Sequence, residues 1–213
     1  MISQKDDFNE KQGLLLESAT EEFFEKGFHG ARMQEIANRA GVNKALVHYY
    51  FRSKENLYKD VIRFQFRRNI AHLLEQLHTQ DSFSTALKHF INGYIDLLAE
   101  NPQIPSFMLR ELADGGIIVG GILKELMGQE ELQAVKAVKK LMNRAVREGE
   151  IARQDLPQLI MTVVGACIYS FVASPIIEVF MTPGSTTSAS FLKARKRAVF
   201  NTIYNGIQTR RSR

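Results

Sequence analysis

The chain has 213 residues, of which 45% are hydrophobic, and it carries a formal net charge of +5. Its length and composition suffice for a substantial core in one or two domains. The mild basic excess permits nucleic-acid binding without requiring it, and the single cysteine, Cys167, excludes an intramolecular disulfide framework.

Long helical hydrophobic patterns and few turn signals predict an all-α protein of about nine helices. The boundaries rest on residues that cap or interrupt helices, such as Gly27, Gly41, Asn43, Ser53 and Ser82. The expected helices cover about 8–26, 33–40, 44–50, 53–77, 82–101, 105–113, a segment that follows 117–128 and ends near Gly149, 156–181 and 188–208.

The fourth of these helices is predicted to be one continuous rod. About 25 residues at ~1.5 Å each give a length of roughly 37 Å. We expect the domain boundary near 70–80, inside or just after this helix. A rod that begins at the N-terminal domain and ends in the second one would convert a small shift at its far end into a larger displacement.

Residues 36–51 read IANRAGVNKALVHYYF and describe two short helices joined at a glycine. Gly41 allows a sharp turn, and the small side chains of Ala37 and Ala40 allow the two helices to approach closely. Lys, His and Tyr side chains follow on the second helix. This combination is typical of a helix-turn-helix, whose second helix enters the major groove of DNA.

The second helix has an outward face of polar and small residues: Lys44, Ala45, His48 and Tyr49. Ammonium, imidazole and phenol groups bind phosphates and base edges. Asn43 and Lys54 lie at helix N-termini, where backbone N–H groups favour an anion. Between residues 32 and 68, nine Lys and Arg stand against three Asp and Glu, which favours a DNA-facing surface.

The stretch from Gly27 to Leu57, GFHGARMQEIANRAGVNKALVHYYFRSKENL, resembles the DNA-binding domain of the TetR family of bacterial transcriptional regulators. The matching residues are Gly27-Phe28, Ile36-Ala37, Ala40-Gly41-Val42, Lys44, Tyr49, Phe51 and Lys54-Glu55-x-Leu57. The resemblance implies a DNA-binding domain over 9–69, with its helix-turn-helix at about 32–51, and a helical effector-binding and dimerisation domain over 80–210.

The resemblance also implies DNA contact by Lys44 and Tyr49, with Lys54 beside a phosphate. Together with the residues of the outward face, the expected DNA-binding set is Arg32, Gln34, Asn43, Lys44, Ala45, His48, Tyr49 and Lys54. Arg32 replaces the Thr or Ser that usually caps the second helix, Ala45-Leu46 replaces a small pair, and His48 and Tyr50 stand where Tyr and His are common. These differences lie on or beside the reading surface and therefore bear on the operator sequence.

The second domain is expected to bind a small apolar or aromatic effector. The expected pocket residues are Phe64, Tyr94, Phe107, Met108, Met142 and Tyr169, with Arg110 or Glu111 as the one charged contact. Two alternatives stay open at this point. Arg110 and Glu111 could form a surface ion pair, and Tyr94 and Tyr169 could satisfy hydrogen bonds within a core.

The segment 156–177 carries no charge and is long enough to span a bilayer. Polar residues and Pro175 interrupt it, and no cluster of Lys and Arg flanks it, so a buried helix fits better than a membrane span. We expect a homodimer through 156–181 and 188–208, because Gly165, Ala166, Ala173 and Ser174 allow close helix contact. The polar N-terminus lacks the apolar segment of a secretory signal, which favours a cytoplasmic protein with no membrane partner.

The sequence predicts neither a metal site nor a cofactor, because its five His residues lack the helical spacing of metal ligands. No catalytic constellation is recognisable either, so we expect no enzyme. The interpretation is a ligand-responsive DNA-binding regulator, most simply a repressor that binds a palindromic operator as a dimer. The alternatives are a TetR-like regulator that has no small ligand and answers to a protein partner, and a helical enzyme with an incidental basic patch.

Overall fold

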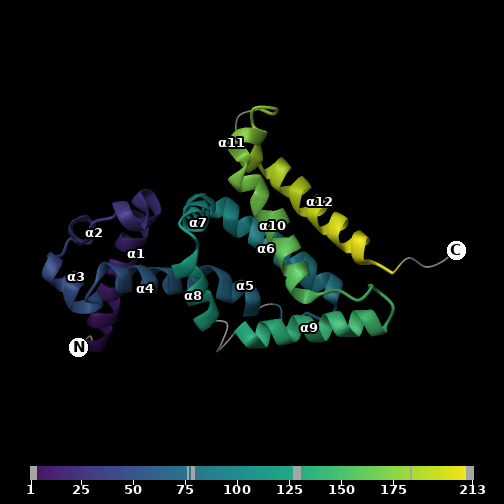
Figure 1. The fold of residues 1–213 in the computed structure, drawn as a ribbon, viewed down its shortest axis with the longest axis horizontal. Coiled ribbons are helices and arrows are strands. Elements are labelled where there is room, and N and C mark those ends of the chain that lie inside the picture. Colours follow the sequence, from purple (N-terminus) through teal and green to yellow (C-terminus); the bar gives the residue numbers. More distant parts are fainter. Residues whose placement is uncertain (1–3, 76, 78–79, 127–130, 183, 210–213) are drawn as a thin grey trace. The chain divides into compact units, whose positions relative to one another are not determined.

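The computed structural model describes residues 4–75, 77, 80–126, 131–182 and 184–209 (Figure 1). Within these ranges the chain is helical and has no strand, apart from an isolated bridge between Ile151 and Gln208. The prediction of an all-α protein is therefore confirmed. No helix in the described part of the chain is both long enough and apolar enough to cross a membrane.

Contacts divide the chain into two compact units. We call residues 1–68 with 106–126 the head, and residues 69–105 with 127–213 the body. The head therefore takes up a segment from the middle of the chain, which the sequence prediction had assigned to the second domain. The chain passes from head to body between Arg68 and Asn69, and back into the head within a helix, between Pro105 and Ser106.

The head is built from four N-terminal helices and two later ones. These are α1 (Gln4–Gly30), α2 (Met33–Arg39), α3 (Lys44–Phe51), α4 (Lys54–Phe66), most of α7 (Gln103–Ala113) and α8 (Ile117–Leu126). Helix α1 packs on α2 and α4, α3 packs on α2 and α4, and α8 packs on α4.

The core of the head follows the four-residue spacing of its helices. Leu15, Ala19 and Phe23 of α1 are fully buried, as the sequence pattern predicts. They meet fully buried side chains from the next three helices, namely Ile36, Ala37, Val47, Leu57, Tyr58 and Val61. Gly27 leaves the helical conformation at φ 69° and ψ 176°, which confirms that the regular part of α1 ends there.

The continuous fourth helix is the main error of the prediction. Helix α4 ends at Phe66, a π-helical turn follows at Arg67–Ala71, and a short α5 covers His72–Glu75. A π-helical turn closes its hydrogen bonds over five residues instead of four, and the spacing of apolar side chains does not reveal this change. The passage from head to body lies inside this turn.

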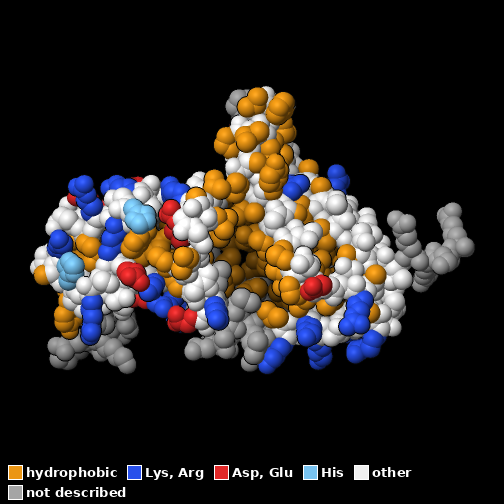
Figure 2. Space-filling model, in the orientation of Figure 1, with side chains coloured by type: hydrophobic (Ala, Val, Ile, Leu, Met, Phe, Trp, Pro, Cys, Tyr) orange, Lys and Arg blue, Asp and Glu red, His pale blue; other side chains and the backbone are white. Residues whose placement is uncertain are grey.

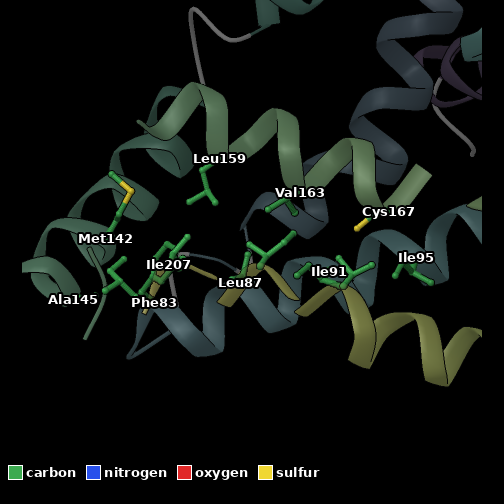
Figure 3. Packing of buried hydrophobic residues seen from close by; sticks show 13 residues of the cluster. Phe83, Leu87, Ile91, Ile95, Met142, Ala145, Leu159, Val163, Cys167 and Ile207 are labelled. Carbon is green, nitrogen blue, oxygen red and sulfur yellow. The ribbon is translucent and has the colours of Figure 1, made fainter. Parts of the chain in front are cut away.

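The body is arranged around α6 (Phe83–Glu100), which packs against α5, α9 (Glu131–Arg147), α10 (Leu156–Val172) and α12 (Ala189–Ile207). Figure 3 shows the core between them. Its buried residues are Phe83, Leu87, Ile91, Ile95, Met142, Ala145, Ile151, Leu159, Val163, Cys167, Val199, Ile203 and Ile207. Burial raises the pKa of the Cys167 thiol to about 12, so this side chain acts as a small apolar group.

Two further helices differ from the expected pattern. Helix α8 is a separate element where a lead-in segment was expected, and residues 127–130, which join it to α9, lie outside the described part. Helix α10 stops at Val172, and α11 (Ser174–Ile177) follows it, because Pro175 cannot donate a backbone N–H to continue the helix.

The predicted caps Asn43, Ser53 and Ser82 are confirmed, since each side chain accepts a backbone N–H of its helix.

Candidate nucleic-acid interface

The turn between α2 and α3 requires a glycine. Gly41 has φ 65°, a conformation that other residues adopt only with strain. The N–H of Val42 donates to the carbonyl of Ala37 at 3.0 Å, which closes the turn. Ala37 and Ala40 are buried, so the two helices approach closely, as the sequence predicts.

Helix α3 begins at a side-chain cap. Asn43 Oδ1 accepts the N–H of Leu46 at 2.8 Å, which satisfies a donor that a helix N-terminus otherwise leaves free. The Asn43 residue is exposed. Its amide nitrogen therefore stays free to donate while its oxygen holds the helix start.

The two faces of α3 have opposite character. Val47 is fully buried and Phe51 is 2% exposed, and both anchor the helix to the head. The other face carries only exposed residues: Lys44, Ala45, His48 and Tyr49. Tyr49 is 72% exposed, an unusual position for an aromatic side chain, and its ring packs edge-on against that of Tyr50. A cation, an imidazole and a phenol therefore project together from one helix.

The cations of the head divide into paired and unpaired groups. Acidic side chains bind Arg39, Lys59, Arg63 and Arg68, including Glu17, Glu21 and Glu25 of α1. Among the described residues, no ion pair involves the side chains of Arg32, Lys44 or Arg52, all of which are exposed. Figure 2 shows several Lys and Arg side chains and two His side chains on the visible face of the head. Three of the cations without an ion pair among the described residues thus lie at the two ends of the helix-turn-helix and on α3.

Lys54 and Gln34 of the expected DNA-binding set form hydrogen bonds to other residues of the head. Lys54 Nζ donates to the carbonyl of His29 at 3.2 Å and lies 5.0 Å from the centre of the Phe28 ring. Burial lowers the pKa of Lys54. Gln34 Nε2 donates to Asn38 Oδ1 at 3.0 Å on the surface of α2. The Lys54 ammonium therefore ties the start of α4 to the end of α1, a role that the sequence did not reveal.

A buried carboxylate fixes the start of α2. Glu22 of α1 is fully buried and accepts the N–H of Arg32 at 3.3 Å and the Lys26 ammonium at 2.9 Å. Arg39 Nε lies 3.3 Å from the other carboxylate oxygen. Burial alone would raise the pKa of Glu22, but these partners outweigh it and hold the pKa below its ordinary value. Arg32 makes no side-chain cap, so this carboxylate secures α2 from outside the helix.

Arg110 and Glu111 of α7 bind two other helices of the head, α1 and α4. Glu111 is 6% exposed and accepts a short hydrogen bond from the Tyr58 hydroxyl of α4. Arg110 donates to the carbonyl of Phe24, near the end of α1. The alternative of a surface ion pair is therefore wrong, because the two side chains bind separate partners on α4 and α1. Burial, and then the Glu111 carboxylate, raise the pKa of Tyr58 well above its ordinary value.

Aromatic rings enclose this joint. The Tyr58 ring contacts Phe23, Phe28 and Phe107 at centroid distances of 4.8, 5.0 and 6.1 Å. We expect Tyr58→Phe to lower the free energy of unfolding by about 2 kcal/mol, because it leaves a buried carboxylate without its donor. Urea unfolding measures this, and Tyr49→Phe serves as the control, because Tyr49 is 72% exposed on α3. An equal, small loss in both variants would contradict a stabilising bond at Tyr58.

The remaining candidate ligand residues fall into different units. Phe64, Phe107 and Met108 belong to the head, and Phe107 stacks on Phe24 at 4.6 Å. In the body, Met142 is 5% exposed within the core (Figure 3). Tyr94 stacks on Phe90, and both pack against that core. Tyr169 is 63% exposed on α10. In the described ranges no group of three His, Cys, Asp or Glu side chains is arranged to hold a metal ion.

The link between α3 and α4 is a strained turn centred on Arg52. Arg52 has φ 63° and ψ −44°, and the N–H of Ser53 donates to the carbonyl of Phe51 at 2.7 Å. These values describe a γ-turn of the rare, strained form. Among the described residues, no other non-glycine has a positive φ.

We expect Arg52→Gly to raise the free energy of unfolding by about 1 kcal/mol, because glycine adopts a positive φ without the steric strain of a side chain. Thermal and urea unfolding check this. Lys140→Gly, at an exposed position inside α9, should lower stability and acts as the opposite control. Destabilisation by Arg52→Gly would show that the arginine side chain holds the turn.

The head contains the residues that match a known protein family. Residues 15–61 match the family model described as bacterial regulatory proteins, tetR family. The HTH-type transcriptional regulator RutR of Escherichia coli K12 is 28% identical over 201 residues, covering 94% of this chain and 92% of that protein. The HTH-type transcriptional activator FasR of Mycolicibacterium smegmatis is 32% identical over 95 residues, 45% of this chain and 43% of FasR.

Solved structures share the fold. The regulator FadR from Bacillus subtilis, in complex with stearoyl-CoA, has a TM-score of 0.68 at 18% identity, over 92% of this chain and 98% of that one. The fatty acid degradation regulator FadR from Bacillus halodurans has a TM-score of 0.67 at 17% identity, over 89% and 94% of the two chains. The family match shows that residues 15–61, which include the helix-turn-helix, form a domain of the tetR family of bacterial regulatory proteins, and the solved structures share the helical fold of the chain.

Proposed function

We propose that this DNA-binding transcriptional regulator is a homodimeric repressor that binds a two-fold symmetric operator and is released by a small apolar effector. The exposed face of α3 carries the proposal, because Lys44 and Tyr49 project there and Lys44 has no ion pair to any described residue. Two such helices in one dimer would enter successive major grooves about 34–36 Å apart. Tyr49 and Lys44 supply the donors, and Asn43 and Arg32 lie beside them at the helix starts.

The dimer interface that we propose lies on α10, α11 and α12. The exposed large apolar side chains of α10 and α11 are Ile160, Met161, Tyr169 and Ile176, and Val179, Phe180 and Met181 follow α11 in the chain. Figure 2 shows hydrophobic side chains covering the tip of α10 and α11. A surface of this kind marks an interaction site on a protein, and a second copy of the chain would cover it.

The small residues within this surface have different environments. Ala173 is 8% exposed, and Ala166 packs against the core of its own subunit. Both were expected to allow close contact between subunits, but a charge at either position would disturb the body itself. At Gly165, in contrast, an added Cβ would meet no atom within 4 Å. Gly165 is therefore the position that tests the interface.

The effector that we propose is apolar and contains a long hydrocarbon chain. The support comes from the stearoyl-CoA complex of a structure with the same fold and from aromatic side chains such as Tyr94. The test is a thermal-shift screen with long-chain acyl-CoA thioesters and free fatty acids, followed by a DNA-release assay with each stabilising compound. Stabilisation together with lower DNA affinity supports the proposal. A regulator controlled by a protein partner would show neither response.

We propose that effector binding acts on the helix-turn-helix through α7, and not through a rigid α4. Helix α4 is interrupted by the π-helical turn, whereas α7 is unbroken and contributes residues to both units. Its Arg110 and Glu111 hold α1 and α4. A shift of α7 would therefore act on both supports of the helix-turn-helix.

A reporter gene tests the proposal of a repressor against activation, the activity for which FasR is named. Deletion of this regulator should raise the expression of a reporter gene placed behind the operator. A fall in expression on deletion would show that the protein is an activator. The relatives named above are transcriptional regulators, which disfavours the alternative of a helical enzyme. Failure to retain any duplex DNA would restore that alternative.

A further inference from the structure

His48 forms a hydrogen bond that fixes which of its ring nitrogens carries a proton. Its Nδ1 lies 3.3 Å from the carbonyl oxygen of Arg52. A carbonyl oxygen only accepts, so Nδ1 must be the donor. The N–H of Arg52 in turn donates to the carbonyl of His48 at 2.8 Å. The strained turn at Arg52 thus holds its carbonyl beside the imidazole.

The proton on Nδ1 determines whether the outward nitrogen of His48, Nε2, can donate or accept a hydrogen bond. In the neutral ring, Nε2 carries only a lone pair and can act only as an acceptor. In the protonated ring, Nε2 becomes a charged donor. His48 is exposed on the same face of α3 as Lys44 and Tyr49. A DNA duplex presents phosphate oxygens and mostly acceptor atoms to such a face.

We propose that His48 binds the operator as an imidazolium, with Nδ1–H held by Arg52 and Nε2–H donated to a phosphate oxygen. This inference rests on the proposed DNA-binding function and adds a charge state to it. DNA binding then takes up a proton at each subunit. DNA affinity should therefore be higher at low pH and fall as the pH rises.

No described acidic side chain is paired with the His48 ring. Lys44 lies one turn before it and Arg52 one turn after it, and the described residues include no carboxylate paired with its ring. The charged side chains on the helices packed against α3 are Glu35 and Arg39 of α2, and Lys54, Glu55, Lys59, Asp60 and Arg63 of α4. Among the described residues none of these acids is paired with the His48 ring, so a phosphate would supply the counter-charge on binding.

Two substitutions separate the two edges of the ring. His48→Asn retains an amide near the position of Nδ1, so it keeps a donor for Arg52 and loses the outward nitrogen. His48→Gln places an amide donor near the position of Nε2 but does not titrate. His29→Asn is the matched control, because His29 is exposed in the same head outside the helix-turn-helix. All variants are measured with one duplex, selected from a random-sequence pool by the wild-type protein at pH 6.5.

We expect the wild-type affinity to fall about tenfold or more per subunit between pH 6 and pH 8 at fixed ionic strength. His48→Asn should bind at every pH as weakly as the wild type does at pH 8, and His48→Gln should also show no pH dependence. His29→Asn should follow the wild type. Calorimetry in two buffers of different ionisation enthalpy should detect proton uptake by the wild type and none by His48→Asn.

An affinity that rises with pH would overturn the inference, because His48 would then accept from a base amino group as the neutral ring. An identical pH profile in the wild type and His48→Asn would overturn it as well. Either result leaves the DNA-binding function in place. Failure of the wild type to retain any duplex at every pH would instead contradict the proposed function itself.

Discussion

Replacing Lys44 by Ala is expected to weaken operator binding by about 1–3 kcal/mol per subunit, the range for a lost base-edge or phosphate contact. Lys44 is exposed at the first turn of α3, and its ammonium has no ion pair among the described residues. Its removal costs the fold nothing, so the whole loss should appear in DNA affinity. Tyr49→Phe, which removes only a hydroxyl, should have a smaller effect of the same sign.

The salt dependence identifies the kind of contact that is lost. If Lys44 binds a phosphate, the slope of log affinity against log salt should flatten by about one unit per subunit. Lys124→Ala is the matched control, since it removes the same charge from an exposed position on α8 of the same head. Equal affinities and slopes for the wild type and Lys44→Ala, at unchanged thermal stability, would remove α3 from the interface.

The second large effect is expected at the interface between subunits. Gly165→Glu should convert the dimer into monomers at micromolar concentration, because it places a bulky charge on the apolar face of α10. Within one subunit the added side chain would extend into open space, so the fold itself has no reason to change. Light scattering or sedimentation measures the mass, and circular dichroism checks that the helices persist.

The matched control is Gly13→Glu on α1, where an added Cβ also meets no atom within 4 Å. It should leave the mass unchanged. The monomeric Gly165→Glu variant should also bind the operator much more weakly, because one recognition helix alone reaches only one half-site. A dimeric Gly165→Glu protein, or a monomeric wild type, would place the subunit contact elsewhere or exclude it.

Local signals in the sequence were sufficient for most helix boundaries. Asn43, Ser53 and Ser82 cap their helices because a short polar side chain reaches the free N–H groups two or three residues ahead. The positive φ of Gly41 likewise follows from the residue type. These interactions span few residues, so the sequence pattern predicts them directly.

Long-range contacts account for what the sequence did not reveal. The hydrogen bond between Tyr58 and Glu111 joins positions 53 residues apart, and that between Arg110 and Phe24 joins positions 86 apart. Glu22 is an acid at a fully buried position, which hydrophobic patterning treats as an exception instead of a structural anchor. The free charge between residues 32 and 68 was similarly overestimated, because three cations of this segment bind acids that lie outside it in the head.

The turn at Arg52 shows the limit of residue preferences. Arginine rarely adopts a positive φ, so the composition FRSK predicted only a separation between two helices. The strained residue joins α3 to α4, and strain of this kind is concentrated at functional sites. In this protein it lies next to the face that we expect to read DNA.

The most direct test of DNA recognition by α3 is selection of duplexes from a random-sequence pool by the wild-type protein and by Lys44→Ala. For the wild type, the predicted result is a two-fold symmetric motif whose half-site centres lie about 10–10.5 base pairs apart, or a multiple of that spacing. Lys44→Ala should recover the motif weakly or with relaxed preference in each half-site. Recovery of no common motif by the wild type, or of an equally strong and identical motif by both proteins, would contradict this account.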